Sequence, residues 1–473
     1  MKTPLPDLNG NESMLDERIL SQLSTIVGHE HLVTDKTNLD IFSSDALSPN
    51  RAHNLLNELH ILPSAVIFPT SNKQVSEIIK LANLNVIPVT PVGGGTGVMG
   101  GIAPLADSLM ISLKKMNKLI TLDLPSRSVT VEAGMILGEL NSFLRTKHHI
   151  LGHDPYSLPI ASVGGAISTN GVGYTASKYG TMGEQVIGLE TVLPSGELLP
   201  ISHIPNSSVG PDVSNLFIGT EGTLGIITAA CIKIYPEPKT TRFLTIGFHD
   251  FKTGYNLLSE IYDANLRPSL LELNESQNGI TMHLVFDGEP DVIDASVKWV
   301  TTKLDNKQQF LLNPDITSSY WNNRHTSAKL YANNALNKPR DVKWKRNTNT
   351  IFEYLHFSLP PSQILKFKQA SERIINQNKL TVTEFAIWGK PDFFSIMIIP
   401  AEPHSTSTQQ LHEASEKLIL LSCDMGGSIE YCHGVGIKLK HIVQTELGAS
   451  YDLIKTLKTT LDPNYIMNPN KYI

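Results

Sequence analysis

The sequence contains little cysteine, no excess of basic charge and no long hydrophobic run, and each absence excludes a class of protein. The three cysteines among 473 residues, Cys231, Cys423 and Cys432, cannot form a disulfide framework and lack metal or redox spacing. Lys and Arg number 39 against 45 Asp and Glu, so a formal charge of −6 argues against nucleic-acid binding. No apolar run is long enough to span a bilayer.

The start of the chain is also polar and lacks the apolar segment of a signal peptide. We therefore expect a reduced, cytoplasmic protein. Peripheral attachment to a membrane stays open, as does a homodimer.

The length and the pattern of strands and helices predict an α+β fold with more than one domain. We expect residues 1–60 to form an N-terminal helical arm and residues 61–238 a ligand-binding domain of two α+β subdomains. We expect residues 239–440 to form a cap domain with an antiparallel sheet and helices on one face. The final segment, residues 441–473, is expected to return to the ligand site.

Glycine is concentrated in two turns. Five glycines fall within residues 93–100, directly after the apolar run 86–92, and a second group occupies residues 164–165 and 171–173. Glycine leaves backbone N–H groups uncovered and permits positive φ, so such turns form concave anion sites. One such turn alone would indicate only close strand packing. Two of them favour one long, phosphate-bearing ligand held at several points.

Residues 95–100 match the dinucleotide pattern G-x-G-x-x-G, which requires a helix immediately after the glycines. Here Pro104 and the apolar residues 107–113 predict a loop and a strand instead. We therefore reject a nicotinamide-binding fold.

Taken together, several short motifs show what the chain resembles. They lie at residues 69–70, 91–101, 152–155, 163–165, 170–173, 179–180, 219–225, 432–436 and 466–469. The chain resembles FAD-dependent oxidoreductases of the vanillyl-alcohol-oxidase type, with the C-terminal domain of FAD-linked oxidases. The resemblance implies FAD between two α+β subdomains, with the later domain capping its isoalloxazine ring.

The same resemblance implies positions for the cofactor. The backbone of the first glycine turn should hold the pyrophosphate, and residues of the second should line the flavin and ribityl chain. A further motif should hold the adenosine end, and the C-terminus should return to the site, with Lys471 expected to be solvated. The implied FAD residues are Gly93, Gly94, Gly95, Thr96, Gly97, Pro155, Ser157, Gly164, Gly165, Ser168, Asn170, Gly171, Glu221, Gly222, Ile227 and Asn468.

Many members of this family attach FAD through a histidine in the first glycine turn. That turn contains no histidine here, so we predict noncovalent FAD.

Within the family, the chain resembles the D-lactate dehydrogenase and glycolate oxidase branch, which oxidises D-2-hydroxy acids. His433 in the His-Gly-Val-Gly motif is the expected base, since an imidazole titrates near neutral pH. Arg324 is the expected clamp for the substrate carboxylate, with Arg340 as a weaker candidate. The electron acceptor stays open among a quinone, a cytochrome, a flavoprotein and oxygen.

Two departures from that branch are visible. The stretch that commonly supplies two zinc-binding histidines has Ile387 and Phe394 in their places, and Cys432 replaces a glutamate before His433. A new ligand set of Glu430, Cys432, His433 and His441 can be imagined, but we predict no metal.

Two alternatives remain. The alkylglycerone-phosphate synthase branch, which belongs to ether-lipid synthesis, shares the stretch 152–157, but Glu272 stands where that branch carries an arginine. A carboxylate opposite a substrate phosphate disfavours this alternative. A non-catalytic flavin-binding subunit of an oxidase complex is the second alternative, because the zinc-type histidines are lost.

Overall fold

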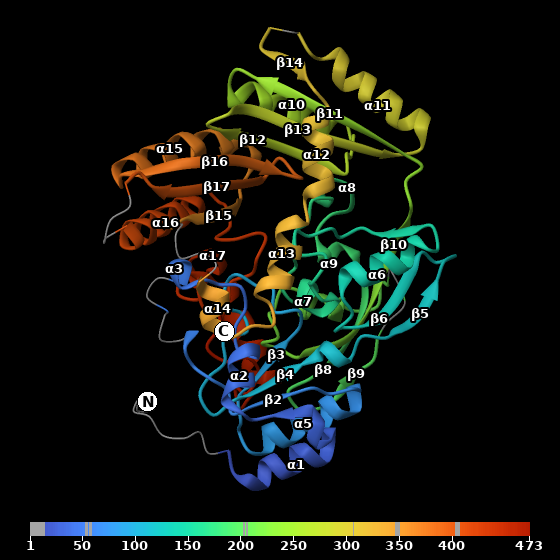
Figure 1. The fold of residues 1–473 in the computed structure, drawn as a ribbon, viewed down its shortest axis with the longest axis vertical. Helices are drawn as coiled ribbons and strands as arrows, with labels where there is room; N and C mark the ends of the chain where they lie inside the picture. Colours follow the sequence, from blue (N-terminus) through green and yellow to red (C-terminus); the bar gives the residue numbers. More distant parts are fainter. Residues whose placement is uncertain are drawn as a thin grey trace.

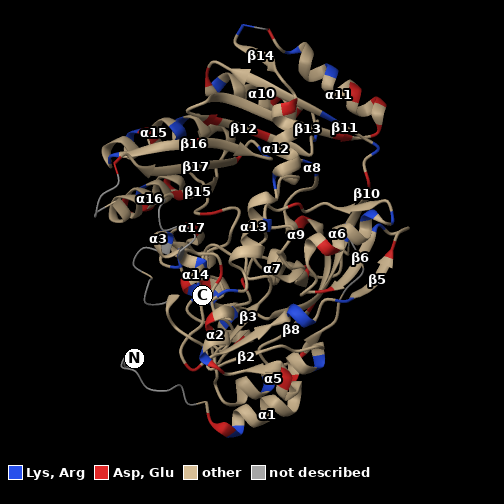
Figure 2. Ribbon diagram, viewed as in Figure 1, with Lys and Arg blue, Asp and Glu red and all other residues tan. Residues whose placement is uncertain are grey.

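The computed structural model describes residues 15–52, 55, 59–201, 204, 207–305, 307–345, 351–402 and 407–473. It shows two small sheets in one half of the molecule and a large sheet in the other (Figure 1). Acidic and basic residues are scattered over both halves, in keeping with their near-equal numbers (Figure 2). Within the described ranges, no helix has the length and apolar character needed to cross a membrane.

The first sheet has four strands in the order β1-β2-β4-β3. Strands β2, β4 and β3 run parallel, and β1 pairs with β2 antiparallel. The crossover helix α5 begins after Ser71, whose side chain accepts a hydrogen bond from the Gln74 N–H. The elements of this part are α1 (Glu17–Val27), β1 (Leu32–Val33), α2 (Lys36–Phe42), α3 (Pro49–Ala52), β2 (Ala65–Ile67), α5 (Asn72–Leu84), β3 (Val89–Val92) and β4 (Leu109–Ser112).

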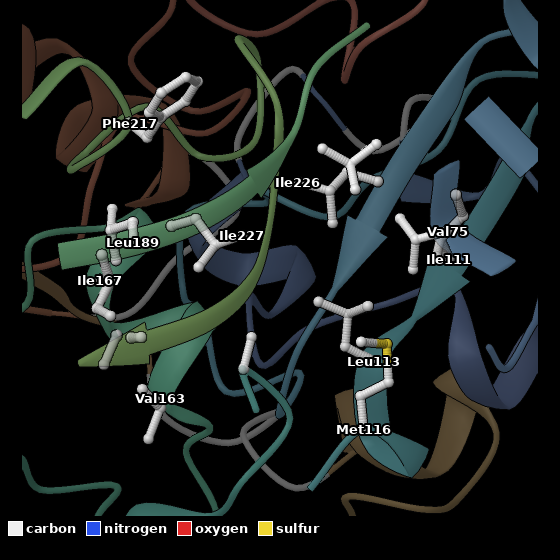
Figure 3. Packing of buried hydrophobic residues seen from close by; sticks show 14 of the residues in the cluster. Val75, Ile111, Leu113, Met116, Val163, Ile167, Leu189, Phe217, Ile226 and Ile227 are labelled. Atoms are coloured by element: carbon white, nitrogen blue, oxygen red, sulfur yellow. The ribbon is translucent and has the colours of Figure 1, made fainter. Parts of the chain in front are cut away.

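The second sheet is antiparallel, in the order β5-β6-β10-β8-β9, and β7 also pairs with β10. One hydrophobic cluster joins the two small sheets: Val75 and Ile111 come from the first part, and Leu189 and Ile227 from the second (Figure 3). The elements are β5 (Leu119–Asp123), β6 (Ser128–Glu132), α6 (Leu137–Arg145), β7 (His149–Leu151), α7 (Val163–Ser168), α8 (Ala176–Tyr179), α9 (Met182–Gln185), β8 (Val186–Val192), β9 (Leu198–Leu199) and β10 (Ile226–Pro236).

The third sheet has seven antiparallel strands in the order β14-β11-β13-β12-β16-β17-β15. We call it the cap sheet, and helices α10, α11, α15 and α16 cover it on one side (Figure 1). The elements are β11 (Thr240–Phe248), α10 (Phe251–Asp263), β12 (Leu270–Ser276), β13 (Gly279–Gly288), α11 (Pro290–Thr302), β14 (Gln309–Leu312), β15 (Glu353–Ser358), α15 (Ile364–Gln377), β16 (Leu380–Trp388), β17 (Phe393–Pro400) and α16 (Ser407–Asp424).

The cap sheet has one apolar and one polar face, because side chains alternate along a strand. Leu271 and Leu273 of β12, like Leu355 of β15, belong to the core under the helices. Glu272 and His356 point to the opposite face and are nevertheless buried. The sheet therefore buries polar groups on the side that faces the rest of the molecule.

Two later segments join the halves. Helices α12 (Asp315–Asn323), α13 (Thr326–Asn334) and α14 (Arg340–Lys345) run from the cap sheet to the other half, where Ala328 and Tyr331 pack on Ile160. After α17 (Val443–Leu447) and α18 (Ser450–Leu461), the C-terminus returns to the first sheet, where Met467 forms a bridge with Val89.

The predicted α+β class is confirmed, and the strand expected within residues 107–113, where a nicotinamide-binding fold requires a helix, is observed as β4. The N-terminal arm is more than helical, since β1 joins the first sheet. Residues 1–14 lie outside the described ranges. The division into domains stays a proposal; the second sheet ends with Pro236 and the cap sheet begins with Thr240.

Lys458 provides a test of the C-terminal attachment. Its ammonium is fully buried and donates to Asp462 Oδ2 (2.6 Å), Thr223 O (2.7 Å) and Met467 O (2.8 Å). Lys458→Met should lower the free energy of unfolding by about 3–5 kcal/mol, because the buried Asp462 carboxylate loses its cation. Urea unfolding measures this loss. Lys455→Met, an exposed position on the same helix, is the matched control; equal stability of the two variants would contradict the prediction.

Candidate functional site

A cavity of about 520 Å³ lies between the two halves. The glycine turns line it on one side, and β12, β15 and β16 of the cap sheet line it on the other. Of the residues implied for FAD, all but Asn170 and Asn468 line the cavity, and so does His433. The lining members are Gly93, Gly94, Gly95, Thr96, Gly97, Pro155, Ser157, Gly164, Gly165, Ser168, Gly171, Glu221, Gly222 and Ile227.

The first glycine turn has no room for side chains behind it. A Cβ on Gly93 would lie 2.2 Å from Ser162 Oγ, and one on Gly94 would lie 2.4 Å from Ile160 O. Gly95 has φ +69°, and its only neighbour within 4 Å would be a methyl of Leu336, at 4.0 Å. The turn therefore packs tightly on residues 160–162 and presents bare backbone to the cavity.

Asn170 and Asn468 have structural roles. The Asn170 side chain accepts a hydrogen bond from Gly183 N (2.9 Å). Asn468 donates to Gly101 O (3.1 Å) and Glu221 O (2.6 Å), so it attaches the C-terminus to the wall of the cavity instead of lining it. Lys471, expected to be solvated, is buried and donates to Ala103 O (2.9 Å); that expectation was wrong.

Glu221 lines the cavity, but its carboxylate binds protein. It accepts hydrogen bonds from Val435 N (2.5 Å) and Gly436 N (3.0 and 3.1 Å), directly after the His433 turn. Burial raises the pKa of Glu221, and these two backbone donors oppose the shift. The residue thus connects the cap loop to the floor of the cavity.

The structure does not bring Arg324 to the cavity wall. Its Nε lies 2.8 Å from Asp154 Oδ2, and its guanidinium stacks on Trp321 at 3.7 Å from the ring centre. His325 contacts the other carboxylate oxygen of Asp154 at 2.8 Å. Because Asp154 already binds its guanidinium, Arg324 is not placed to clamp a substrate carboxylate. Arg340 is similarly bound to Asp40 (2.6 Å).

His433 reaches the cavity from the cap loop. Its Nδ1 lies 3.7 Å from Glu430 Oε2, and Cys432 lies beside it. Burial lowers the pKa of His433, but Cys432 and the Glu430 carboxylate outweigh this and raise it to about 10. This direction favours the protonated imidazole, whereas a general base must be neutral, so the role of His433 as the base stays a prediction.

His356 on β15 is a second histidine at the cavity, and no motif in the sequence pointed to it. Its ring centre lies 4.6 Å from that of His433. Its Nδ1 lies 2.8 Å from Ser395 Oγ, while Nε2 is buried with no hydrogen-bond partner among the described residues. Burial, with the nearby His433 charge, lowers the pKa of His356 to about 3, so it is neutral.

Two cations that the sequence did not point to meet one carboxylate near this end of the cavity; Arg51 lies on the cavity wall, and Lys438 lies behind it. Arg51, in the N-terminal arm, lines the wall and binds Glu353 Oε1 through Nε (3.0 Å) and Nη2 (2.8 Å). Lys438 binds the same oxygen at 2.7 Å. Burial lowers the pKa of Lys438 to about 8, which still leaves it mostly protonated at pH 7. Two positive charges thus face one carboxylate.

Glu272, on the central strand β12 of the cap sheet, also lines the cavity and is 5% exposed. Tyr320 donates a hydrogen bond to Glu272 Oε2 (2.8 Å). Burial, with the nearby Glu384 carboxylate, raises the pKa of Glu272 to about 8. The neighbouring His283 is kept neutral by burial, which lowers its pKa to about 4. Glu272 is thus mostly protonated at neutral pH.

The residues considered for a metal do not converge. Ile387 and Phe394 lie in the core on the helix side of the cap sheet. His441 contacts Glu416 at 3.0 Å, apart from the His433–Glu430 pair. In the described part of the chain, no group of three His, Cys, Asp or Glu side chains is arranged to hold a metal ion.

Comparison with known proteins decides the family. Residues 63–202 match the FAD binding domain, and residues 237–472 match the FAD linked oxidases, C-terminal domain. The chain belongs to the FAD-linked oxidase family. It is an FAD-dependent oxidoreductase, which acts on a small-molecule substrate and passes electrons to an acceptor.

Relatives match over nearly the whole chain. D-lactate dehydrogenase [cytochrome] 1, mitochondrial, of Saccharomyces cerevisiae is 27% identical and covers 96% of this chain and 79% of its own length. Glycolate oxidase subunit GlcD of Bacillus subtilis is 25% identical, covering 97% of each. The FAD-linked oxidoreductase YgcU of Escherichia coli K12 is 27% identical, covering 95% and 97%.

Solved structures show the same fold. An alkyldihydroxyacetonephosphate synthase aligns with a TM-score of 0.77 at 19% identity, over 98% of this chain and 88% of its own. A 4-ethylphenol oxidase from Gulosibacter chungangensis gives 0.72 at 19% identity, over 96% of each chain. These identities establish the fold alone.

The residues that line the cavity fit the chemistry of FAD. Bare glycine backbone faces it at the first turn, as a pyrophosphate requires. His153, 3% exposed, also lines it, and its Nδ1 has no partner among the described residues. Burial lowers the pKa of His153 to about 4, so it offers a neutral polar group to the cofactor.

The glycine turn yields a prediction about cofactor binding. Gly94→Val should reduce the FAD content of the purified protein at least about tenfold, because the added side chain collides with Ile160 O and displaces the turn. The ratio of flavin to protein absorbance measures this. Gly210→Ala is the control: it adds a Cβ at φ +69° that has no atom of the described residues within 4 Å, and it lies outside the cavity wall. A fully yellow Gly94→Val protein would refute this placement.

Glu272 yields a prediction about stability. A carboxyl whose pKa rises from 4.5 to about 8 on folding holds a proton that the unfolded chain releases, so stability falls between these pH values. Glu272→Gln should remove this pH-dependent loss of stability. Above pH 8 the free energy of unfolding of the variant should exceed that of the wild type by a few kcal/mol. Denaturant unfolding from pH 4 to 9 tests this. Glu275→Gln, on the helix side of the same strand, is the matched control. A constant difference between wild type and Glu272→Gln at every pH would disprove it.

Proposed function

We propose that the protein oxidises a small D-2-hydroxy acid to the 2-oxo acid, with noncovalently bound FAD. The observation that carries this proposal is a pair of histidines at one cavity. The ring centres of His433 and His356 lie 4.6 Å apart; His433 Nδ1 is 3.7 Å from the Glu430 carboxylate, and His356 Nδ1 is 2.8 Å from Ser395 Oγ. Despite burial, the Glu430 carboxylate raises the pKa of His433, and burial lowers that of His356, which favours a protonated His433 and a neutral His356. A 2-hydroxy acid carries an anion and a hydroxyl on adjacent carbons, and these two groups match the two histidines.

In this proposal the carboxylate lies at the cationic end. His433 and Arg51 attract it, and the pair Arg51 and Lys438 retains a net positive charge after Glu353 is counted. A carboxylate there also offsets the positive charges of His433 and Arg51 that lower the pKa of His356. Substrate binding therefore makes His356 a better base.

The hydroxyl proton passes to His356 Nε2. We assign the Nδ1 proton to the hydrogen bond with Ser395 Oγ (2.8 Å), which leaves Nε2 as an acceptor. Ser395 Oγ lies 3.1 Å from Tyr431 Oη, so its orientation is fixed in turn. When bound, FAD supplies the oxidant, which takes the hydride from C2 as the C–H bond breaks and the carbonyl forms.

Noncovalent binding is supported by the first glycine turn, where residues 93–97 carry no nucleophilic side chain except the Thr96 hydroxyl. Acid precipitation should therefore release all the flavin into the supernatant.

The roles of His356 and His433 are tested by measuring the rate of anaerobic flavin reduction by D-lactate at a series of pH values. The rate constant should rise with pH as His356 loses its proton and fall near pH 10 as His433 does. His356→Gln should lower the saturating rate constant about 100- to 1,000-fold, the usual contribution of a general base, and remove the acid limb. His433→Gln should raise the half-saturating substrate concentration and remove the alkaline limb.

His441→Gln, at a partly exposed histidine outside the cavity, is the matched control. Normal reduction in His356→Gln, together with complete loss in His433→Gln at unchanged substrate affinity, would return the role of base to His433.

A further inference from the structure

The cavity-facing side of the cap sheet contains polar groups that the proposed oxidation does not use. Glu272 and Trp388 are direct partners across strands β12 and β16, so their side chains lie next to each other on one face. Both line the cavity. They lie on the central strands of the cap sheet, whereas His356 is on the edge strand β15.

Trp388 lacks a partner in this setting. Its indole Nε1 is buried and has no acceptor among the described residues. An indole N–H can only donate, and an unsatisfied buried donor costs about 1–3 kcal/mol. A ligand that brings an acceptor would remove this cost.

The surroundings of Glu272 restrict the chemical groups that a ligand can place beside Trp388. Its carboxyl is buried beside Glu384, whose Oε1 accepts from Asn274 Nδ2 at 2.7 Å. The only Lys and Arg residues on the cavity wall in the described ranges are Arg51 and Lys343, neither of which belongs to β12 or β16. A second carboxylate or a phosphate here would lie beside Glu384 with no Lys or Arg on β12 or β16 to balance its charge, and it would gain nothing from the neutral Glu272 beyond one hydrogen bond.

The uncharged and positively charged groups that remain differ in the hydrogen bonds they can form with Trp388 and Glu272. An ammonium group would suit the carboxyls but has no lone pair for the Trp388 N–H. An alkyl chain satisfies neither residue. A hydroxyl can accept from Trp388 and donate to Glu272 at once, so it is the group that satisfies both.

We propose that the substrate is a 2-hydroxy acid whose carbon chain carries further hydroxyl groups, and that Glu272 and Trp388 bind these hydroxyls. The inference rests on the proposed function, which places the carboxylate and the reacting carbon near His433 and His356. Glu272 and Trp388 then select among hydroxy acids by the groups beyond C2.

A substrate series of equal configuration at C2 tests this. Anaerobic flavin reduction is measured with D-lactate, D-glycerate, D-erythronate and D-gluconate. D-2-Hydroxybutyrate has the carbon number of D-erythronate without its extra hydroxyls. D-2-Hydroxyglutarate supplies a second carboxylate, and (R)-isoserine supplies an ammonium group.

We expect D-erythronate to exceed D-2-hydroxybutyrate at least about tenfold in reduction rate constant divided by half-saturating concentration, because a site built for hydroxyls rejects analogues that lack them. Trp388→Phe keeps the aromatic ring and loses only the donor, and it should lower this ratio about tenfold. Trp299→Phe is the matched control on α11, which covers the opposite side of the sheet.

The outcomes separate the two proposals. If D-lactate and D-2-hydroxybutyrate react as well as D-erythronate, or if D-2-hydroxyglutarate or isoserine reacts best, the proposed function stands and this inference is wrong. If erythritol and glycerol reduce the flavin but no hydroxy acid does, the hydroxyl site stands and the proposed function is wrong. If no compound of the series reduces the flavin, both are wrong. If Trp388→Phe leaves the preference for D-erythronate over D-2-hydroxybutyrate unchanged, Trp388 does not bind the substrate hydroxyls.

Discussion

The position of the loop that carries His433 depends on the buried carboxylate of Glu221. This residue lies in the glycine-rich stretch 219–225 and has φ +52°, a conformation that few non-glycine residues adopt. Its carboxylate receives the N–H groups of Val435 and Gly436, and its backbone carbonyl receives the Asn468 amide. Buried charge is tolerated only with such donors. The cofactor wall, the His433 turn and the C-terminus are therefore fixed relative to one another through this residue.

Around this fixed loop, charge is distributed unevenly along the cavity. Arg51, Lys438 and the protonated His433 outnumber Glu353 and Glu430 at one end. Glu272 and Glu384 lie together elsewhere on the cap sheet, on β12 and β16. Relatives named for D-lactate and glycolate align over 96% and 97% of this chain, while the solved synthase and phenol oxidase share the fold. Because a shared fold does not fix the substrate, the choice of substrate has to come from the side chains that line this cavity.

Local signals predicted the fold well and the charge states poorly. Glycine spacing pointed to the cavity floor, and periodicity to most strands, because both are properties of short segments. Arg324 was expected to be available, but its partner Asp154 lies 170 residues earlier. Arg51 comes from a helix of the N-terminal arm with no motif, and β15 brings His356 within 4.6 Å of His433. The charge on His433 depends on Glu430 and on burial, which tertiary packing decides.

The alternation of the cap sheet also bears on how such an enzyme can diverge. Glu272 of β12, Tyr354 and His356 of β15 and Trp388 of β16 line the cavity, while Leu273, Leu355 and Ile387 on the same strands belong to the core under the helices. A change at Glu272 or Trp388 therefore leaves Leu271, Leu273 and Ile387 in place. Single substitutions on this face can therefore change which molecules the cavity binds while the packing that stabilises the β-sheet is kept, so that selectivity and stability can evolve independently.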